Sequence, residues 1–173
     1  MTQQQYTSHK TSRRQVPALH RALLKIEKWN PNTISHNLDV GGGRFEDATE
    51  ALRQASVQNA VYDPYNRSDE HNEAVLSRYD YDTATVANVL NVIAERDVRI
   101  DVLRIAAERA ETVYVTVYEG DKTYEGRPTR DGWQEHRPLQ SYALDECREV
   151  FDSVFMLRIG RVKVIRCRNK KTA

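Results

Sequence analysis

Apolar residues along the chain recur at two different spacings, which separate predicted helices from predicted strands. Val16, Leu19, Leu23 and Ile26 recur near the helical period, so 16–26 is predicted to be an amphipathic helix. The segment 83–93 is a near-continuous apolar run, which is typical of a strand buried on both faces. The same two patterns predict, in order, strand 36–40, helix 46–54, strand 60–62, helix 97–108, strand 112–118, helix 144–151, and strands 153–159 and 162–167.

The order of these segments predicts an α/β fold with a mostly parallel sheet. Strands that alternate with helices pair in parallel, because each crossover helix returns the chain to the same end of the sheet. The two-residue turn Gly160-Arg161 can join only antiparallel neighbours. We therefore expect a Rossmann-like sheet with helices on both faces and one antiparallel C-terminal hairpin strand.

Length and composition allow one domain and favour the cytoplasm. The chain has 173 residues, 39% hydrophobic and 29% charged, which is the size and composition of a single soluble domain. We expect residues 1–12, which lack an apolar signal core, to form a flexible N-terminal arm, and 13–173 to form the domain. No apolar run approaches the roughly 20 residues that cross a membrane. The two cysteines, Cys147 and Cys167, are expected to be packing residues.

A glycine turn directly follows the first predicted strand, in the sequence Asp39-Val40-Gly41-Gly42-Gly43. In open α/β sheets, ligands bind beyond the carboxyl ends of the strands, and glycine lets the backbone approach them closely. The carboxylate of Asp39 can hold an ammonium group by a charge-assisted hydrogen bond. S-adenosylmethionine (SAM) carries such a group, whereas a dinucleotide presents a pyrophosphate there. A plain turn is the alternative interpretation.

Polar residues also end the next two predicted strands. Asp63 lies 20 residues after Gly43, where an acid can accept hydrogen bonds from both ribose hydroxyls of a nucleoside. Alternatively, Asp63 and the following proline only open a turn. Asn88 and Asn91 lie inside an apolar run, where an unsatisfied amide costs roughly 1–3 kcal/mol. A ligand at the sheet edge and the neighbouring backbone are both candidate partners for them.

These motifs together resemble class I SAM-dependent methyltransferases and, more narrowly, the DNA phosphorothioation-associated methyltransferase group. The resemblance covers about the first two-thirds of the chain. The sequence differs from that group in Phe45, where a small residue is usual, and in lacking long flanking segments. The matching stretches are His9–Arg13, Asp39–Asp47, Tyr62–Asp69 and Val89–Arg96.

The resemblance implies SAM as the cofactor and assigns residues to it. It places Asp39, Gly41 and Gly43 at the methionyl end, Asp63 at the ribose, and the backbone around Asn88 and Val89 along the cofactor. It also brings the segment Asp80–Asp82 toward the adenine.

The sequence names no catalytic residue and no metal site. The position after the buried strand reads Asn88-Val89-Leu90-Asn91, not the Asp/Asn-Pro-Pro-aromatic motif of base-amine methylation. Neither cysteine follows a proline, as expected of a nucleophile for methylation at cytosine carbon. The five histidines are scattered singly, so no metal is predicted.

Two segments are expected to reach the ligand edge and bind the substrate. One is the end of the arm with the residues that continue it, 9–14, through His9, Lys10 and Arg13, and the other is the loop 119–140, through Arg127 and Trp133. Lys170 and Lys171 are expected at the opposite edge. Nucleic acid is slightly favoured over a small metabolite as the acceptor. The alternatives are a non-catalytic SAM- or nucleoside-binding module or partner subunit, and a small dehydrogenase, which Glu46 near a pyrophosphate disfavours. The oligomeric state is left open.

Overall fold

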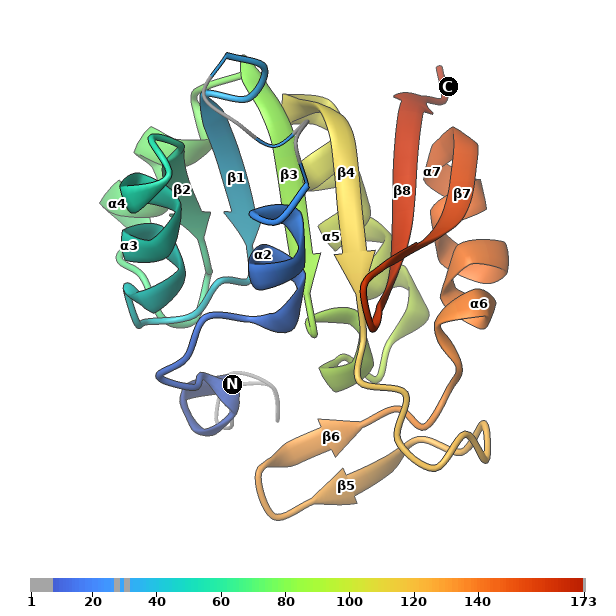
Figure 1. Ribbon diagram of the computed structural model, residues 1–173. Helices are drawn as coiled ribbons and strands as arrows, with labels where there is room; N and C mark the ends of the chain where they lie inside the picture. Colours follow the sequence, from blue (N-terminus) through green and yellow to red (C-terminus); the bar gives the residue numbers. More distant parts are fainter. Residues whose placement is uncertain (1–7, 27–28, 30–31, 173) are drawn as a thin grey trace.

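The computed structural model describes residues 8–26, 29 and 32–172, which form a six-stranded sheet between layers of helices (Figure 1). The strand order is β2-β1-β3-β4-β8-β7. The first four of these run parallel, and β8 lies antiparallel between β4 and β7. The predicted fold class, with its antiparallel C-terminal hairpin strand, is confirmed. The strands are β1 His36–Val40, β2 Gln58–Tyr62, β3 Tyr81–Ala87, β4 Ala110–Thr116, β7 Phe151–Ile159 and β8 Val162–Lys170.

Helices cover both faces of this sheet. On one face, Leu19, Leu23 and Leu52 pack a first apolar cluster against it. On the other face, Leu103 and both buried cysteines belong to a second, larger cluster. Within the described residues, no helix is long and apolar enough to cross a membrane. The helices are α2 Ala18–Leu23, α3 Asp47–Gln54, α4 Asp69–Leu76, α5 Arg96–Arg109, α6 Leu139–Tyr142, a π-helical turn Ala143–Cys147 and α7 Arg148–Val150.

The sequence patterns extended one strand too far and missed helices α4 and α6 and a hairpin between residues 127 and 134. β3 ends at Ala87, Asn88 takes a positive φ of 59°, and Leu90–Val92 forms a 3-10 turn where the predicted strand 83–93 continued. Those apolar side chains are buried in a turn as they would be in a strand, so their pattern does not distinguish the two. Helix α4 was not predicted, and the predicted loop 119–140 contains the hairpin β5 Arg127–Thr129 and β6 Gly132–Gln134.

The two faces of the sheet differ in polarity. Because side chains alternate along a strand, Leu38 and Val40 of β1 enter the larger apolar cluster, and Asn37 and Asp39 point to the face covered by α2. On that face Asn37 donates to Thr85 Oγ1 at 3.0 Å. A buried polar band therefore leads along β1 and β3 toward their carboxyl ends.

A buried ion network holds the chain that follows β6. Glu146 is fully buried, and its Oε1 accepts hydrogen bonds from Arg99 of α5 at 2.9 Å and from Arg137 at 2.8 Å. Arg99 also donates to the carbonyl oxygens of Ile93 and Ala94. The network thus connects the turn after β3, helix α5 and the segment around residue 137.

Glu146→Ala should destabilise the protein by about 3 kcal/mol, because Arg99 and Arg137 lose the buried carboxylate that they share and keep only Glu135, 3.5 Å from Arg99, and the exposed Asp145. Glu149→Ala is the matched control, since Glu149 makes exposed ion pairs that contribute about 0–1 kcal/mol. Urea unfolding of both variants gives the comparison. Equal losses in the two variants contradict a structural role for the buried network.

Candidate active site

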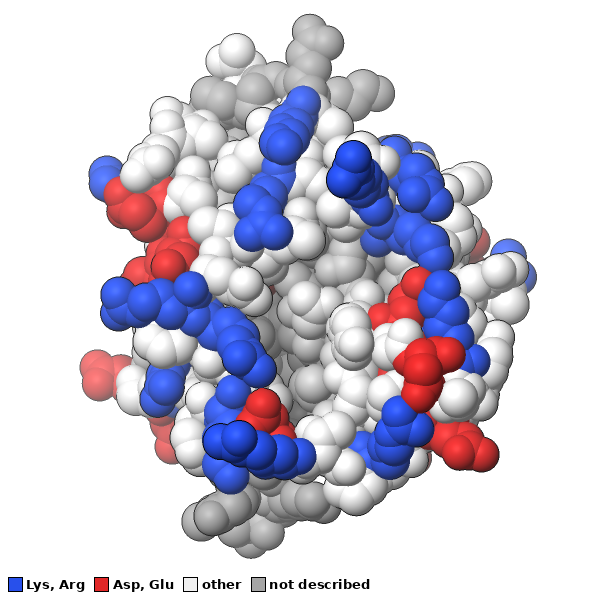
Figure 2. Space-filling view, turned by 60° about the horizontal axis from the view of Figure 1, so that its bottom comes forward, with Lys and Arg blue, Asp and Glu red and all other residues white. Residues whose placement is uncertain are grey.

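A cavity of about 840 Å³ opens at the carboxyl edge of the parallel strands. Its size falls within the roughly 300–1,000 Å³ of small-molecule and cofactor sites. Figure 2 looks toward this edge and shows a hollow flanked on both sides by Lys and Arg side chains. The ends of β1, β2, β3 and β4, the arm, helix α5 and the hairpin β5–β6 all contribute to its wall.

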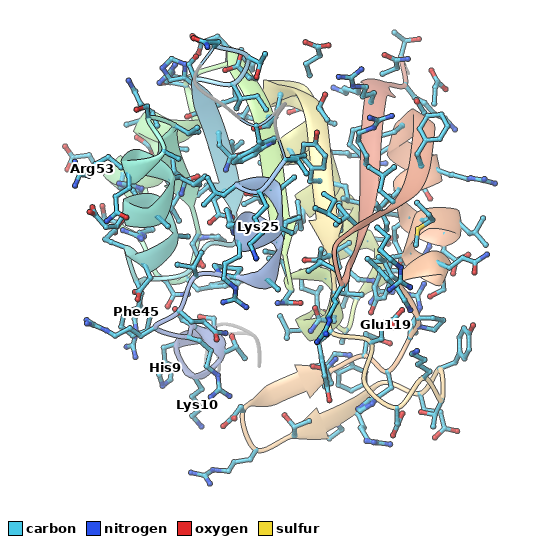
Figure 3. All side chains as sticks on the ribbon, in the orientation of Figure 1. His9, Lys10, Lys25, Phe45, Arg53 and Glu119 are labelled. Carbon is cyan, nitrogen blue, oxygen red and sulfur yellow. The ribbon has the colours of Figure 1, made fainter. Side chains whose placement is uncertain are left out.

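The predicted cofactor residues meet at this cavity, and most of the predicted substrate residues do too. Residues 1–7 of the predicted arm lie outside the described residues, and residues 8–11 form a helical turn. His9 and Lys10 are exposed on that turn and are absent from the cavity wall (Figure 3). The predicted residues that line the cavity are Asp39, Gly41, Gly43, Asp63, Asn88, Val89, Arg13, Arg127 and Trp133.

The glycine turn requires glycine for two separate reasons. Gly41 and Gly43 have φ values of +76° and +77°, in the left-handed region that side chains rarely adopt. A Cβ on Gly41 would also lie 2.6 Å from Val89 Cγ2, and one on Gly42 would lie 2.6 Å from Asp39 Oδ2. The backbone of the turn therefore lies directly against the end of β3 and over the Asp39 carboxylate.

Gly43 is held on both sides of its backbone. Its N–H donates to Asp63 Oδ2 at 2.9 Å, and its carbonyl oxygen accepts from Arg67 Nε at 2.9 Å. Ser12 of the arm holds the next residue, since its Oγ accepts from the N–H of Arg44 at 3.1 Å. The backbone of Gly43 and Arg44 thus joins the ends of β1 and β2 to the arm.

Asp63 opens a turn and also faces the cavity. Its Oδ1 accepts hydrogen bonds from the backbone N–H groups of Tyr65 and Asn66, at 3.0 and 3.1 Å, and from the Asn66 side chain at 3.1 Å. Oδ2 accepts only from Gly43 among the described residues. Since an ionised carboxylate has about four acceptor positions, Oδ2 retains capacity for one ligand hydroxyl. The turn that the sequence left as an alternative is therefore present.

Asp39 is a buried carboxylate with one oxygen incompletely satisfied. It is 1% exposed, and its Oδ1 accepts from Thr85 Oγ1 at 3.1 Å. Oδ2 makes no hydrogen bond within the described part of the chain, and His20 Nε2 lies 3.5 Å from it. Burial raises the pKa of Asp39, and the nearby charge of Asp63 raises it further, while His20 and Thr85 oppose the shift.

His20 of α2 was not predicted as a site residue. It is fully buried, and its Nε2 lies 3.0 Å from Thr85 Oγ1. Because the Thr85 hydroxyl donates its one proton to Asp39 and accepts from Asn37, Nε2 must be the donor to it. No sequence pattern marks this histidine, since its partners are distant in the chain.

The predicted substrate arginines have carboxylate partners. Arg13 of the arm lies 3.4 Å from Asp131 of the hairpin, so an ion pair joins the two segments across the cavity mouth. Arg127 donates to Asp121. The indole of Trp133 donates to Glu135 Oε1 at 2.9 Å.

Two acidic residues and the basic tail lie at the other edge of the sheet. Asp82 accepts from the backbone N–H groups of Ser35 and His36, at the start of β1, and Asp80 pairs with Arg78. The expectation that Asp80–Asp82 approaches an adenine is therefore wrong, because this segment lies at the amino end of β3 and the cavity lies at the carboxyl end. Lys170 pairs with Glu108 before β4 and so lies at the edge opposite the cavity, as expected.

Two further residues line the cavity: Asn91, which the sequence marked as an amide in need of a partner, and His136, which was not predicted as a site residue. Asn91, 2% exposed, donates to Gln134 Oε1 at 3.3 Å, and its carbonyl oxygen accepts from the N–H of Glu135 at 2.7 Å. Strand β6 therefore supplies one of the hydrogen-bond partners that the buried Asn91 amide needs. Among the described residues, no group of three His, Cys, Asp or Glu side chains is arranged to hold a metal ion.

Several solved structures with a similar fold are methyltransferases by name. The chain matches the 1,6-didemethyltoxoflavin-N1-methyltransferase of Burkholderia thailandensis with a TM-score of 0.63 and 13% identity, over 90% of this chain and 80% of that one. It matches the sugar N-methyltransferase KedS8 from Streptoalloteichus sp ATCC 53650 with a TM-score of 0.60 and 9% identity, over 88% and 87%.

A third match, the pyocyanin biosynthetic protein PhzM, has a TM-score of 0.60 and 15% identity, over 88% of this chain and 54% of that one. No protein-family model matches the sequence, and no curated protein is similar to it. At these identities, the three likenesses establish a shared fold.

Asp39→Asn should stabilise the ligand-free protein at pH 7. A raised pKa means that folding favours the protonated carboxyl, so stability falls as pH rises from the unfolded pKa, about 3.9, through the folded one. The variant removes that loss, and a gain of about 1 kcal/mol raises the melting temperature by roughly 2–4 °C.

The gain should vanish near pH 3, where Asp39 is protonated in both states. Asp152→Asn, at an exposed position on β7, is the control and should change little. A lower melting temperature for Asp39→Asn at pH 7 contradicts this account of the buried charge. Thermal unfolding across this pH range provides the measurement.

Proposed function

We propose that this chain is a SAM-dependent methyltransferase that acts on a small-molecule acceptor. The observation that carries the proposal is the pair of carboxylates, Asp39 and Asp63, on the wall of one cavity beside a glycine turn. Asp39 Oδ2 is buried and lacks a hydrogen bond in the described chain, which fits a site for the cofactor's ammonium group. Solved structures with this fold include one with S-adenosylhomocysteine bound.

The residues present fit SAM in three places. Asp39 would hold the ammonium group, the backbone of Gly41 and Gly43 would lie along the methionyl part, and Asp63 Oδ2 would accept from a ribose hydroxyl. Asn88 and Val89, at the end of β3, would lie beside the rest of the cofactor. When bound, SAM supplies an electrophilic methyl group on a sulfonium ion. The protein's own contribution is to orient the two reactants and to exclude water.

A nicotinamide dinucleotide fits the same cavity less well. Its pyrophosphate would have to lie against the glycine turn, where Asp39 is buried and Glu46 follows. Placing a dianion beside a buried carboxylate is unfavourable because like charges repel strongly away from water.

A small acceptor agrees better with the cavity than the nucleic acid slightly favoured by the sequence. The mouth is bounded by the arm and the hairpin, which the Arg13–Asp131 ion pair joins. Arg13 and Arg127 each face a carboxylate, so the two predicted substrate arginines add little net positive charge. The 1,6-didemethyltoxoflavin and sugar methyltransferases with this fold carry small-molecule acceptors in their names.

Calorimetry with two ligands tests the cofactor assignment. Asp39→Asn should weaken SAM binding roughly 10- to 100-fold, since it removes a charge-assisted hydrogen bond, and should leave 5′-methylthioadenosine, which lacks the ammonium group, unchanged. Asp63→Asn should weaken the binding of both ligands, because both carry the ribose. NAD should not bind. Equal effects of Asp39→Asn on both ligands show that the ammonium site is misplaced.

Transfer of a tritiated methyl group from SAM tests catalysis. We expect wild-type protein to label the small-molecule fraction of a cell extract and Asp39→Asn to label it more slowly at subsaturating SAM. Label that appears in DNA or RNA instead identifies a nucleic-acid acceptor. SAM binding without label in any fraction supports the non-catalytic module.

A further inference from the structure

His136 is a buried imidazole on the wall of the proposed active site. It follows β6, is 8% exposed and lines the cavity with Asn88 and Asn91. Its Nε2 makes no hydrogen bond within the described part of the chain. A buried ring nitrogen at a cavity wall is positioned to exchange a hydrogen bond or a proton with whatever occupies the cavity.

The other ring nitrogen of His136 is held by Asp121. Nδ1 accepts from the backbone N–H of Asp121 at 3.1 Å and lies 3.0 Å from the Asp121 carboxylate Oδ1. Gly120 makes this approach possible, because its φ is +59° and a Cβ there would lie 2.2 Å from Nδ1. Asp121 thus presents both a donor and an acceptor to Nδ1, which suits either neutral tautomer and the imidazolium.

The backbone around His136 is fixed by its neighbours on both sides. Glu135 lies 3.5 Å from Arg99, and its N–H donates to the Asn91 carbonyl oxygen. Arg137 binds the buried Glu146. The imidazole is therefore anchored to the turn that follows β3, beside the strand end assigned to the cofactor.

Asn91 adds a second unsatisfied group to the same wall. Its Oδ1 is buried and makes no hydrogen bond within the described residues, although its Nδ2 donates to Gln134. Since Glu135 contacts Asn91 and directly precedes His136, the two side chains come from adjoining segments. Together they offer the cavity one fixed hydrogen-bond acceptor and one proton-exchanging nitrogen.

We propose that His136 is the general base of methyl transfer and that the acceptor is a hydroxyl or ring N–H compound. This inference rests on the proposed function. The acceptor atom forms its bond to the methyl carbon, the carbon–sulfur bond breaks, and its electron pair stays on sulfur. The acceptor's proton passes to His136 Nε2, with the other ring proton on Nδ1 directed at Asp121 Oδ1. Asn91 Oδ1 accepts a hydrogen bond from a second polar group of the acceptor.

The charges around the imidazole agree with this role. Arg127 donates to Asp121 and holds the pKa of that carboxyl at about 2, so Asp121 is ionised when the imidazolium forms. The remaining charged neighbours are already paired, Glu135 with Arg99 and Arg137 with Glu146. Asp121 also pairs with Arg127, but its Oδ1 lies 3.0 Å from Nδ1, so it is the carboxylate placed to stabilise the cation, and it acts as a positioning residue.

The rate of methyl transfer by variants tests the general base. The acceptor in this assay is the small-molecule fraction of the extract that wild-type protein labels. His136→Gln should lower the rate at saturating SAM roughly 10²- to 10⁴-fold and leave the SAM dissociation constant within twofold of wild type. Arg130→Ala, at the exposed turn of the hairpin, is the control and should retain full activity.

Chemical rescue separates catalysis from structural damage. Free imidazole should restore part of the rate of His136→Ala by occupying the space left by the side chain, and should not restore Asp63→Asn. In Asp121→Asn, ¹⁵N NMR should show a changed balance between the two neutral tautomers of His136, because the carboxylate that faces Nδ1 is gone.

The outcomes distinguish the two proposals. Wild-type protein that fails to bind SAM, or binds it and labels nothing, overturns the proposed function. Wild-type transfer with a normal rate in His136→Gln, or with no rescue of an inactive His136→Ala, overturns the assignment of His136.

Discussion

The structure depends on burying one carboxylate at the end of β1. Asp39 lies under the glycine turn, where removal from water disfavours its charge, and a buried charge is tolerated only when hydrogen bonds and opposite charges surround it. Thr85 and His20 supply part of that surrounding from a strand and a helix that are distant in sequence. The polar band on the α2 face of the sheet follows from this need, because Asn37 in turn satisfies Thr85.

The same burial explains why the turn above Asp39 must be built from glycine and held tightly. A side chain on Gly42 would collide with the carboxylate, so the backbone itself forms the roof. Asp63 and Arg67 then hold Gly43 from both sides. The ammonium group of a ligand would offset the unfavourable burial of the Asp39 charge, and this gain would add to the free energy of binding. Such a site is stabilised by its ligand rather than by its own packing.

The parts of this site that follow parallel strands were predictable, since strand ends in an α/β sheet meet at one edge wherever the sequence places them. Asp39 and Asp63 were identified from that rule, Asn88 was assigned through the resemblance to methyltransferases, and all three line one cavity. The apolar run after Ala87 misled, because burial is shared by strands and turns. His20 could not be found, since it contacts Thr85 across 65 positions and lies on an amphipathic helix, where polar residues are expected. His136 is equally unmarked, because its role depends on a fold of residues 119–137 that no periodicity encodes.

The side of the cavity where we propose that the acceptor binds differs in its charges from the side proposed for the cofactor. Arm and hairpin carry most of its charged residues as internal pairs, Arg13 with Asp131 and Arg127 with Asp121. An anionic acceptor would have to displace a carboxylate from its arginine before gaining a salt bridge, and an exposed exchange of that kind yields little net free energy. A neutral acceptor breaks neither pair. It needs hydrogen-bonding partners, which Asn91 and His136 provide. It also needs a base to accept its proton during methyl transfer. Paired charges at the mouth and unpaired polar atoms inside it therefore favour the same kind of acceptor, a neutral molecule with a proton to lose.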